Sequence, residues 1–155
     1  MFWQKLCNES KTLGVDTTLS PLNNVASKGG FEKDRLALIV TTTYNGHPPE
    51  NAKNFTEFCK GLQPKSLSSL KVAIIDIGNS NWKSFQAFPF WIKTVLCSNG
   101  AERLCRRGVA DKENDIQVNT HSWVNFHFWQ PQSSLFGSIP THAPKIPSIT
   151  LIVTY

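Results

Sequence analysis

Two aromatic residues, Tyr44 and Trp82, stand in short polar stretches that could hold a flat ligand. Each stretch mixes its aromatic ring with small or amide residues, whose backbone can come close to a bound molecule. Two rings on neighbouring loops can hold a heterocycle from both faces, and each stacked pair contributes about 0.5–1.5 kcal/mol beyond the area it buries. The candidate binding residues are Thr43, Tyr44, Asn45 and Gly46 in TTTYNGHPP, and Gly78, Asn79, Asn81 and Trp82 in GNSNWKSFQ.

Both stretches follow apolar runs that predict buried strands. Residues 36–41 form a continuous run of leucine, alanine and β-branched residues, and residues 70–77 form a second apolar run that also contains Lys71 and Asp76. Such runs are typical of strands that are covered on both faces. Between them, Pro48-Pro49 can open a helix, and an apolar stripe recurs at helical spacing at Ala52, Phe55, Cys59 and Leu62. This β-α-β pattern predicts parallel strands, whose carboxyl ends place both loops at one edge of a sheet.

The rest of the chain continues the alternation of strands and helices. We expect a helix that begins near Pro89 and ends at Asn99-Gly100, and one more short strand around residues 15–19. The stretch GVADKENDIQ is interpreted as an acidic loop. The fold class predicted from these segments is an open α/β sheet.

The stretches LIVTTTYNGHPPENAKNF, GNSNWKSFQAFPFWI and GAERLCRRGVADKENDI closely resemble the FMN-binding, flavodoxin-like domain of NADPH–cytochrome P-450 reductases. The similarity is greatest to self-sufficient fusions, in which a heme domain precedes the reductase. It runs collinearly from about Leu13 to Trp129. The resemblance implies a flavodoxin-like open parallel sheet with helices on both faces.

The resemblance also implies roles for the two loops. It places Tyr44 and Trp82 against opposite faces of the isoalloxazine ring of FMN, with Gln86 closing the second loop. Asp111 and Asp115 fall where the family has acidic residues near the flavin edge. The implied function is electron relay from NADPH and FAD to a cytochrome P-450 heme, with no catalytic side chain. FAD, NADPH and heme would belong to the full-length protein, and the partners would be its FAD/NADPH reductase domain and its heme domain.

The chain departs from the family in its first strand and in the phosphate loop that should follow it. Neither is found ahead of the strand around residues 15–19, which we expect to lack its neighbour. The predicted domains are a truncated FMN domain at 1–129, a linker at 130–147 and the start of a following reductase domain at 148–155, so we expect a fragment of a larger reductase. Asp76 stands where the family has a small residue, and a buried carboxyl there should stay protonated if unpaired.

Other functions are weighed against this one. A truncated remnant that binds no cofactor is the main alternative, and each rim aromatic taken alone could simply cover the edge of the core. A net charge of +5 suggests nucleic-acid binding as a further alternative. The positive residues are dispersed, however, apart from Arg103, Arg106 and Arg107. The four cysteines and four histidines show no metal-ligand spacing, and no apolar run is long enough to span a membrane. We expect reduced thiols and a cytoplasmic chain.

Overall fold

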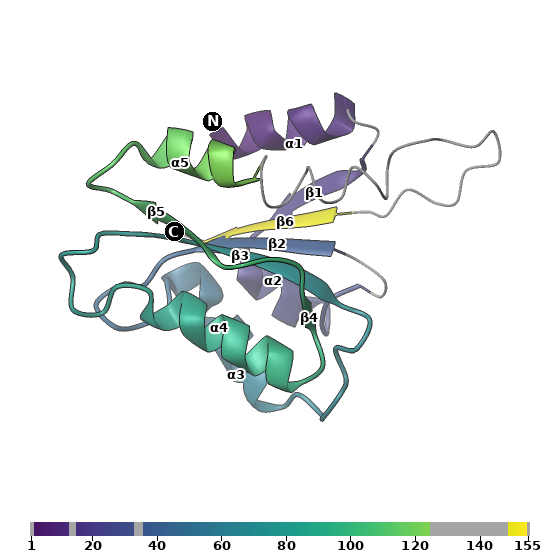
Figure 1. The fold of residues 1–155 in the computed structure, drawn as a ribbon. Coiled ribbons are helices and arrows are strands. Elements are labelled where there is room, and N and C mark those ends of the chain that lie inside the picture. The colour runs from purple at the N-terminus through teal and green to yellow at the C-terminus, as the bar shows by residue number, and fades with distance from the viewer. Residues whose placement is uncertain (1, 13–14, 33–35, 125–148, 155) are drawn as a thin grey trace.

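The described part of the chain forms one parallel β-sheet. The computed structural model describes residues 2–12, 15–32, 36–124 and 149–154. Every strand pairing within these residues is parallel, and the strand order is β1-β6-β2-β3-β4, with β5 also paired to β3 (Figure 1). The strands are β1 (Thr17–Ser20), β2 (Leu36–Thr41), β3 (Lys71–Gly78), β4 (Glu102–Arg103), β5 (Gly108–Asp111) and β6 (Ile149–Thr154).

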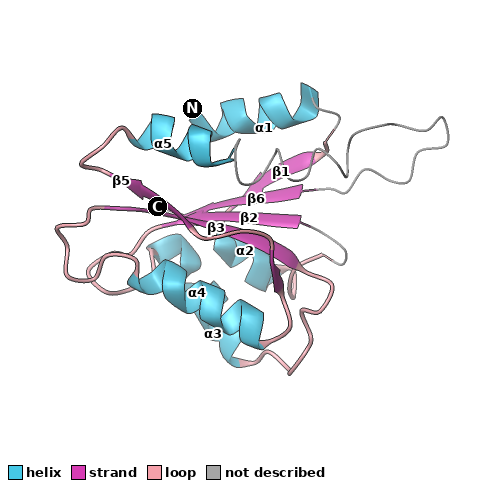
Figure 2. Cartoon of the chain, in the orientation of Figure 1, coloured by secondary structure: helices cyan, strands magenta, loops and turns pink. Residues whose placement is uncertain are grey.

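Helices cover both faces of this sheet, as the sequence predicted. Figure 2 shows α1 and α5 above the strands and α2, α3 and α4 below them. The helices are α1 (Phe2–Thr12), α2 (Leu22–Ser27), the 3-10 turn η1 (Glu50–Ala52), α3 (Lys53–Lys60), α4 (Ala87–Ser98) and α5 (Ile116–Trp123). This layered arrangement confirms the flavodoxin-like α/β class.

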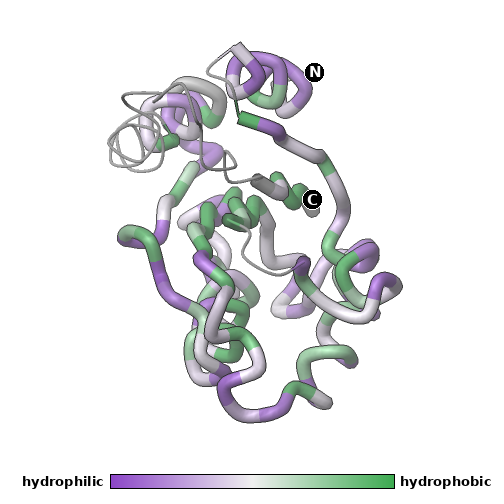
Figure 3. The backbone as a smooth tube through the Cα atoms, turned by 90° about the vertical axis from the view of Figure 1, so that its right-hand side faces the viewer, coloured by the Kyte–Doolittle hydropathy of each residue, from purple (hydrophilic) through white to green (hydrophobic). Residues whose placement is uncertain are grey.

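The core consists of two apolar layers, one on each side of the sheet. Residues of β2 alternate between them: Ile39 packs with α3 and α4 residues such as Phe55 and Ile92, whereas Leu38 packs with Trp3 of α1. All six residues of β2 are buried. Figure 3 shows the hydrophobic colour concentrated along the central strands and the hydrophilic colour mostly outside them. Because both faces are covered, the strands read as continuous apolar runs.

Several predicted elements are confirmed with small shifts. β2 has the predicted bounds, and β3 and β1 are displaced by one or two residues. The helix expected near Pro89 begins two residues earlier, and Gly100 follows it with a φ of +105°. The interpretation of GVADKENDIQ as a loop was wrong at both ends, because Gly108–Asp111 pair with the end of β3 as β5 and Ile116 begins α5.

The strand expected to lack a neighbour has one. β6 lies between β1 and β2 and pairs in parallel with both. Leu151 of β6 has Leu19 of β1 as its partner on one side and Leu38 of β2 on the other. A flavodoxin-like sheet has the strand order 2-1-3-4-5. β6 therefore stands at the position of the first strand in that order, and residues 149–154 complete the sheet from the end of the chain.

The predicted linker, residues 130–147, lies outside the described residues. The domain boundary predicted at residue 148 remains a prediction, although the strand that follows it pairs within this sheet. Among the described helices, none is long and apolar enough to cross a membrane. All four cysteines are free thiols.

Candidate functional site

The first rim loop is a tight turn that presents Tyr44. The backbone N–H of Tyr44 donates to the carbonyl of His47 at 2.9 Å, and the N–H of His47 donates back to Tyr44 at 2.8 Å. Asn45 and Gly46 between them have φ values of 48° and 82°. Positive φ at both central positions is the requirement of a type I′ turn, which Asn-Gly meets at little cost. The turn leaves the Tyr44 side chain 69% exposed.

Thr43, the residue before this turn, has a different position from the one expected of a ligand contact. Its side chain is buried, and its hydroxyl oxygen accepts a hydrogen bond from the backbone N–H of Phe88 at 2.9 Å. Phe88 lies in the first turn of α4, where backbone donors have no intrahelical partner. Thr43 thus links the first rim loop to α4, the helix that follows the loop containing Trp82.

The second rim loop presents Trp82. The N–H of Trp82 donates to the carbonyl of Asn79 at 3.0 Å, and the side-chain oxygen of Asn79 accepts from the N–H of Asn81 at 2.9 Å. These bonds hold Trp82 on the outside of the loop, where its side chain is 45% exposed. The ammonium of Lys112 lies 5.5 Å from the centre of the Trp82 ring, at a distance suitable for a cation–π contact.

A third loop, which follows β5, supports the second. The Asp111 carboxylate accepts hydrogen bonds from the backbone N–H of Ser80 and of Glu113, both at 3.2 Å. A hydrogen bond from the Ser80 side chain is the leading cause that lowers the pKa of Asp111, and the two backbone hydrogen bonds lower it further. The Asn79 amide donates to Glu113 at 2.7 Å. Asp111 therefore acts in this structure as a brace for the loop that carries Trp82.

The two aromatic loops lie next to each other at the carboxyl edge of the sheet. A Cβ atom added at Gly46 would lie 3.9 Å from the Cβ of Ser84 in the second loop. Gln86 closes that loop in a left-handed conformation, with a φ of 66°, and its side-chain oxygen accepts a hydrogen bond from Arg107. The predicted placement of both loops on one rim is therefore correct.

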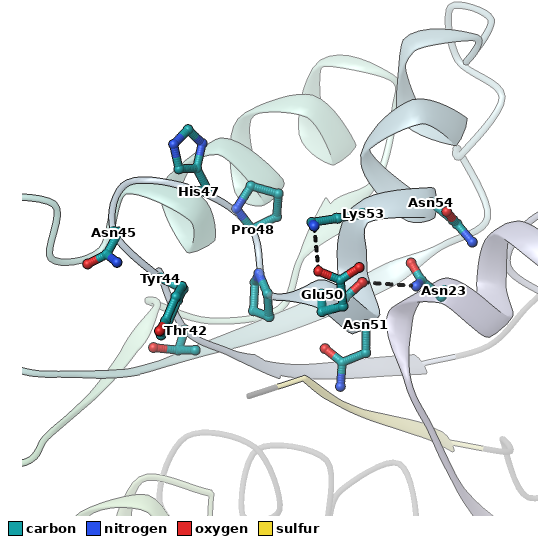
Figure 4. A pocket seen from close by; sticks show the side chains of 11 residues that line it. Asn23, Thr42, Tyr44, Asn45, His47, Pro48, Glu50, Asn51, Lys53 and Asn54 are labelled. Atoms are coloured by element: carbon teal, nitrogen blue, oxygen red, sulfur yellow. Dashed lines mark hydrogen bonds and ion pairs between the residues drawn. The ribbon is translucent and has the colours of Figure 1, made fainter.

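A cleft of about 1100 Å³ opens on one side of Tyr44. Figure 4 shows Thr42, Tyr44 and Asn45 on one side of it and Asn23 of α2 on the other, with the Lys53–Glu50 ion pair between. Trp82 and the other second-loop residues are outside its lining. All of the wall residues that were not predicted, apart from Asn23, stand in the stretch LIVTTTYNGHPPENAKNF, although none was assigned a binding role. They are Asn23, Thr42, His47, Pro48, Pro49, Glu50, Asn51, Lys53 and Asn54.

A buried carboxyl group lies just below the rim. Asp76, in β3 and level with Thr41 of β2, is fully buried, and neither of its carboxylate oxygens has a hydrogen-bond partner among the described residues. Burial raises the pKa of Asp76 to about 7, while the positive charge of Arg107 opposes the shift. The expectation that this carboxyl group holds a proton is consistent with that pKa below neutral pH.

Comparison with known proteins agrees with this fold. The profile of the family described as Flavodoxin matches residues 4–123. A bifunctional cytochrome P450/NADPH–P450 reductase of Bacillus cereus is 32% identical over 135 residues, which is 86% of this chain and 12% of that protein. A protein of the same description from Aspergillus oryzae is 29% identical over 140 residues, or 88% of this chain and again 12% of the relative. The chain therefore spans a small part of these relatives, and it belongs to the flavodoxin family.

Proposed function

We propose that this chain is an FMN-binding electron-transfer domain in which Tyr44 and Trp82 stack on the two faces of the isoalloxazine ring. The observation that carries the proposal is the exposure of both rings, 69% and 45%, on adjacent loops at the carboxyl edge of a parallel sheet. Large aromatic side chains are normally packed inward, so two held outward by their own loop hydrogen bonds indicate a ligand.

The remaining candidate residues fit a flavin in two ways. The turn at Asn45 and Gly46 and the Asn79–Asn81 stretch bring backbone groups and amide side chains to the rim, where they can bond the polar edge of the ring. Gly78 and Gln86 shape the second loop from its two ends, and Thr43 positions the first loop through Phe88. A bound flavin would supply the storage and transfer of electrons, and the chain would tune it by stacking and hydrogen bonding.

The route of the electrons is proposed from the relatives. Their printed names combine a cytochrome P450 with an NADPH–P450 reductase. We propose that the parent of this chain relays electrons from an FAD/NADPH reductase domain to a P450 heme domain, with the present domain between them. No acid or base among the rim residues is assigned a role, because electron relay requires none.

A binding titration tests the proposal. Two stacked rings and a few hydrogen bonds should total roughly 4–7 kcal/mol, or a Kd between about 1 mM and about 10 µM. Because the proposed contacts are all with the ring system, which riboflavin shares, riboflavin should bind nearly as well as FMN. Quenching of flavin fluorescence on stacking gives both constants. Nanomolar FMN binding with a large preference over riboflavin would show that the ring contacts are not the main site.

Variants of the two rings identify the site. Tyr44→Ala and Trp82→Ala should each weaken flavin binding by about 1–3 kcal/mol, while the melting temperature without flavin stays nearly constant because both rings are exposed. Leu19→Ala, which removes an exposed apolar side chain from β1, is the matched control and should change neither quantity. If the aromatic variants unfold the domain and leave flavin affinity unchanged, the rings only cover the core.

A further inference from the structure

A second surface of the molecule, separate from the cleft beside Tyr44, is strongly basic. A groove of about 540 Å³ lies between α4 and the segment that joins β4 to β5, along the edge of the sheet. Figure 1 shows this segment passing beside α4. The residues that line the groove, called the basic groove below, are Phe90, Lys93, Arg103, Arg106, Arg107, Val109 and Trp123.

Three of the four cations of the basic groove have no acidic partner in the described part of the chain, whereas Arg107 interacts electrostatically with the buried carboxyl group of Asp76. Lys93, Arg103 and Arg106 form no ion pair with a described residue, and no carboxylate lines the groove. Arg107 donates to the neutral amide of Gln86, and its buried Nε has no hydrogen-bond partner there. Like charges gathered in one concave surface repel each other, so this arrangement favours an anionic partner.

Apolar side chains stand among these charges. Phe90 is 55% exposed and Val109 is 41% exposed, although both are large hydrophobic residues. The ring of Phe90 lies 4.9 Å from the Lys93 ammonium and 5.7 Å from the Arg107 guanidinium carbon. An exposed aromatic ring in a groove that also contains arginines is typical of protein–protein interfaces, where a guanidinium group can bind a carboxylate through two hydrogen bonds.

We infer that the basic groove is a docking surface for a partner protein that presents carboxylates around an apolar side chain. The carboxylates would pair with Arg103 and Arg106, which are exposed, and the apolar group would pack on Phe90. A protein is favoured over nucleic acid because the charges are confined to one compact groove with an apolar centre, whereas phosphate backbones are tracked by extended basic stripes.

The position of the groove adds a consequence. Arg107 contacts Gln86, and the N–H of Phe90 donates to the carbonyl of Gln86 at 3.0 Å. A docked partner would therefore lie beside the loop that carries Trp82. If that loop holds a flavin, the docked partner would be close enough to exchange electrons with it. This last step alone rests on the proposed function.

The test uses the full chain without flavin, so that its outcome is independent of the proposed function. The probe is a fluorescent peptide of glutamates with a central leucine, and its Kd is measured by anisotropy at low and moderate salt. Arg103→Glu with Arg106→Glu should weaken binding roughly tenfold or more. Lys5→Glu with Lys28→Glu makes the same change in net charge at exposed sites elsewhere and should have a much smaller effect.

A second comparison separates docking from general charge attraction. Phe90→Ser should weaken binding of the leucine-containing peptide but leave binding of an all-glutamate peptide unchanged. The inference is overturned by equal losses in the two charge-reversal variants, by no effect of Phe90→Ser, or by tighter binding of an oligothymidylate of equal charge than of the peptide. Circular dichroism of each variant confirms that the fold is retained, and Lys93→Glu provides a further groove variant if one fails to fold.

Discussion

A Cβ atom added to Gly78 would lie 2.8 Å from two carbons of the Phe85 ring, closer than side-chain carbons approach each other. Phe85 thus rests directly on the backbone of Gly78, at the point where β3 becomes the second rim loop. The glycine is required here for its small size, since its φ is not in the left-handed region.

Gly78→Ala should therefore displace the Phe85 ring and lower the free energy of unfolding by about 1–3 kcal/mol. The measurement is urea denaturation. Gly61→Ala is the control, because an added Cβ there meets its nearest atom, the Phe58 carbonyl oxygen, at an ordinary 3.6 Å. Equal losses in the two variants would show that overlap with Phe85 is not the cause.

The pH dependence of stability should report Asp76. Its pKa is raised to about 7 in the folded state by burial, so between about pH 4 and pH 7 the folded protein holds a proton that the unfolded chain has released. Stability is therefore highest near pH 4 and falls as the pH rises toward 7, by an amount on the order of 4 kcal/mol, and it levels off at higher pH.

Asp76→Asn should remove most of this slope, whereas Asp16→Asn, at an exposed carboxyl group, should retain it. Urea denaturation at several pH values between 5 and 8 provides the comparison. A variant that keeps the slope of the parent would assign the titration to another group.

The register partners Leu19 and Leu151 provide a test of the position of β6. They lie opposite each other on neighbouring strands, yet Leu19 is 42% exposed and Leu151 is 1% exposed. Leu151→Asp should bury a carboxylate in the core and abolish cooperative thermal unfolding. Leu19→Asp should shift the melting temperature by only a few degrees. Similar small shifts in both variants would mean that residues 149–154 do not lie in the sheet in solution.

The turn at Gly46 connects stability to binding. An alanine at a φ of +82° costs about 1–2 kcal/mol, and Gly29→Ala, at +78° with no atom near the added Cβ, should cost a similar amount. Only Gly46→Ala changes the turn that presents Tyr44, so it alone should also weaken flavin binding. Parallel measurements of melting temperature and flavin titration make the comparison, which fails if Gly29→Ala weakens binding to the same extent.

Local sequence patterns were sufficient to predict those features that depend only on neighbouring residues in the chain. The run at residues 36–41 is apolar throughout because both faces of β2 are covered, and this predicted its bounds directly. The loop expected after this strand is likewise present, and the φ values of Asn45 and Gly46 show that it is a tight turn. The adjacency of the two rim loops followed from the parallel β-α-β topology alone.

Features that depend on distant pairing were missed. β5 has only four residues, and its pairing with β3 decides that it is a strand at all. The wall of the cleft opposite Tyr44 is supplied by Asn23, which follows a different strand and carries no local sign of its role. The position of β6 depends on which gap in the sheet can accept it, and no local pattern contains that information.

The central position of β6 has a consequence for how this chain acquires its structure. β1 is joined to the rest of the sheet through β6, and Leu36 of β2 pairs with Ile149, near the other end of the chain. While the chain is being synthesised, β1 and β2 would each have an unpaired edge until β6, which ends at residue 154, has left the ribosome. Sheets assembled from such remote segments fold slowly and are prone to aggregate while incomplete. Production in the presence of chaperones, or at low temperature, should therefore increase the yield of folded protein.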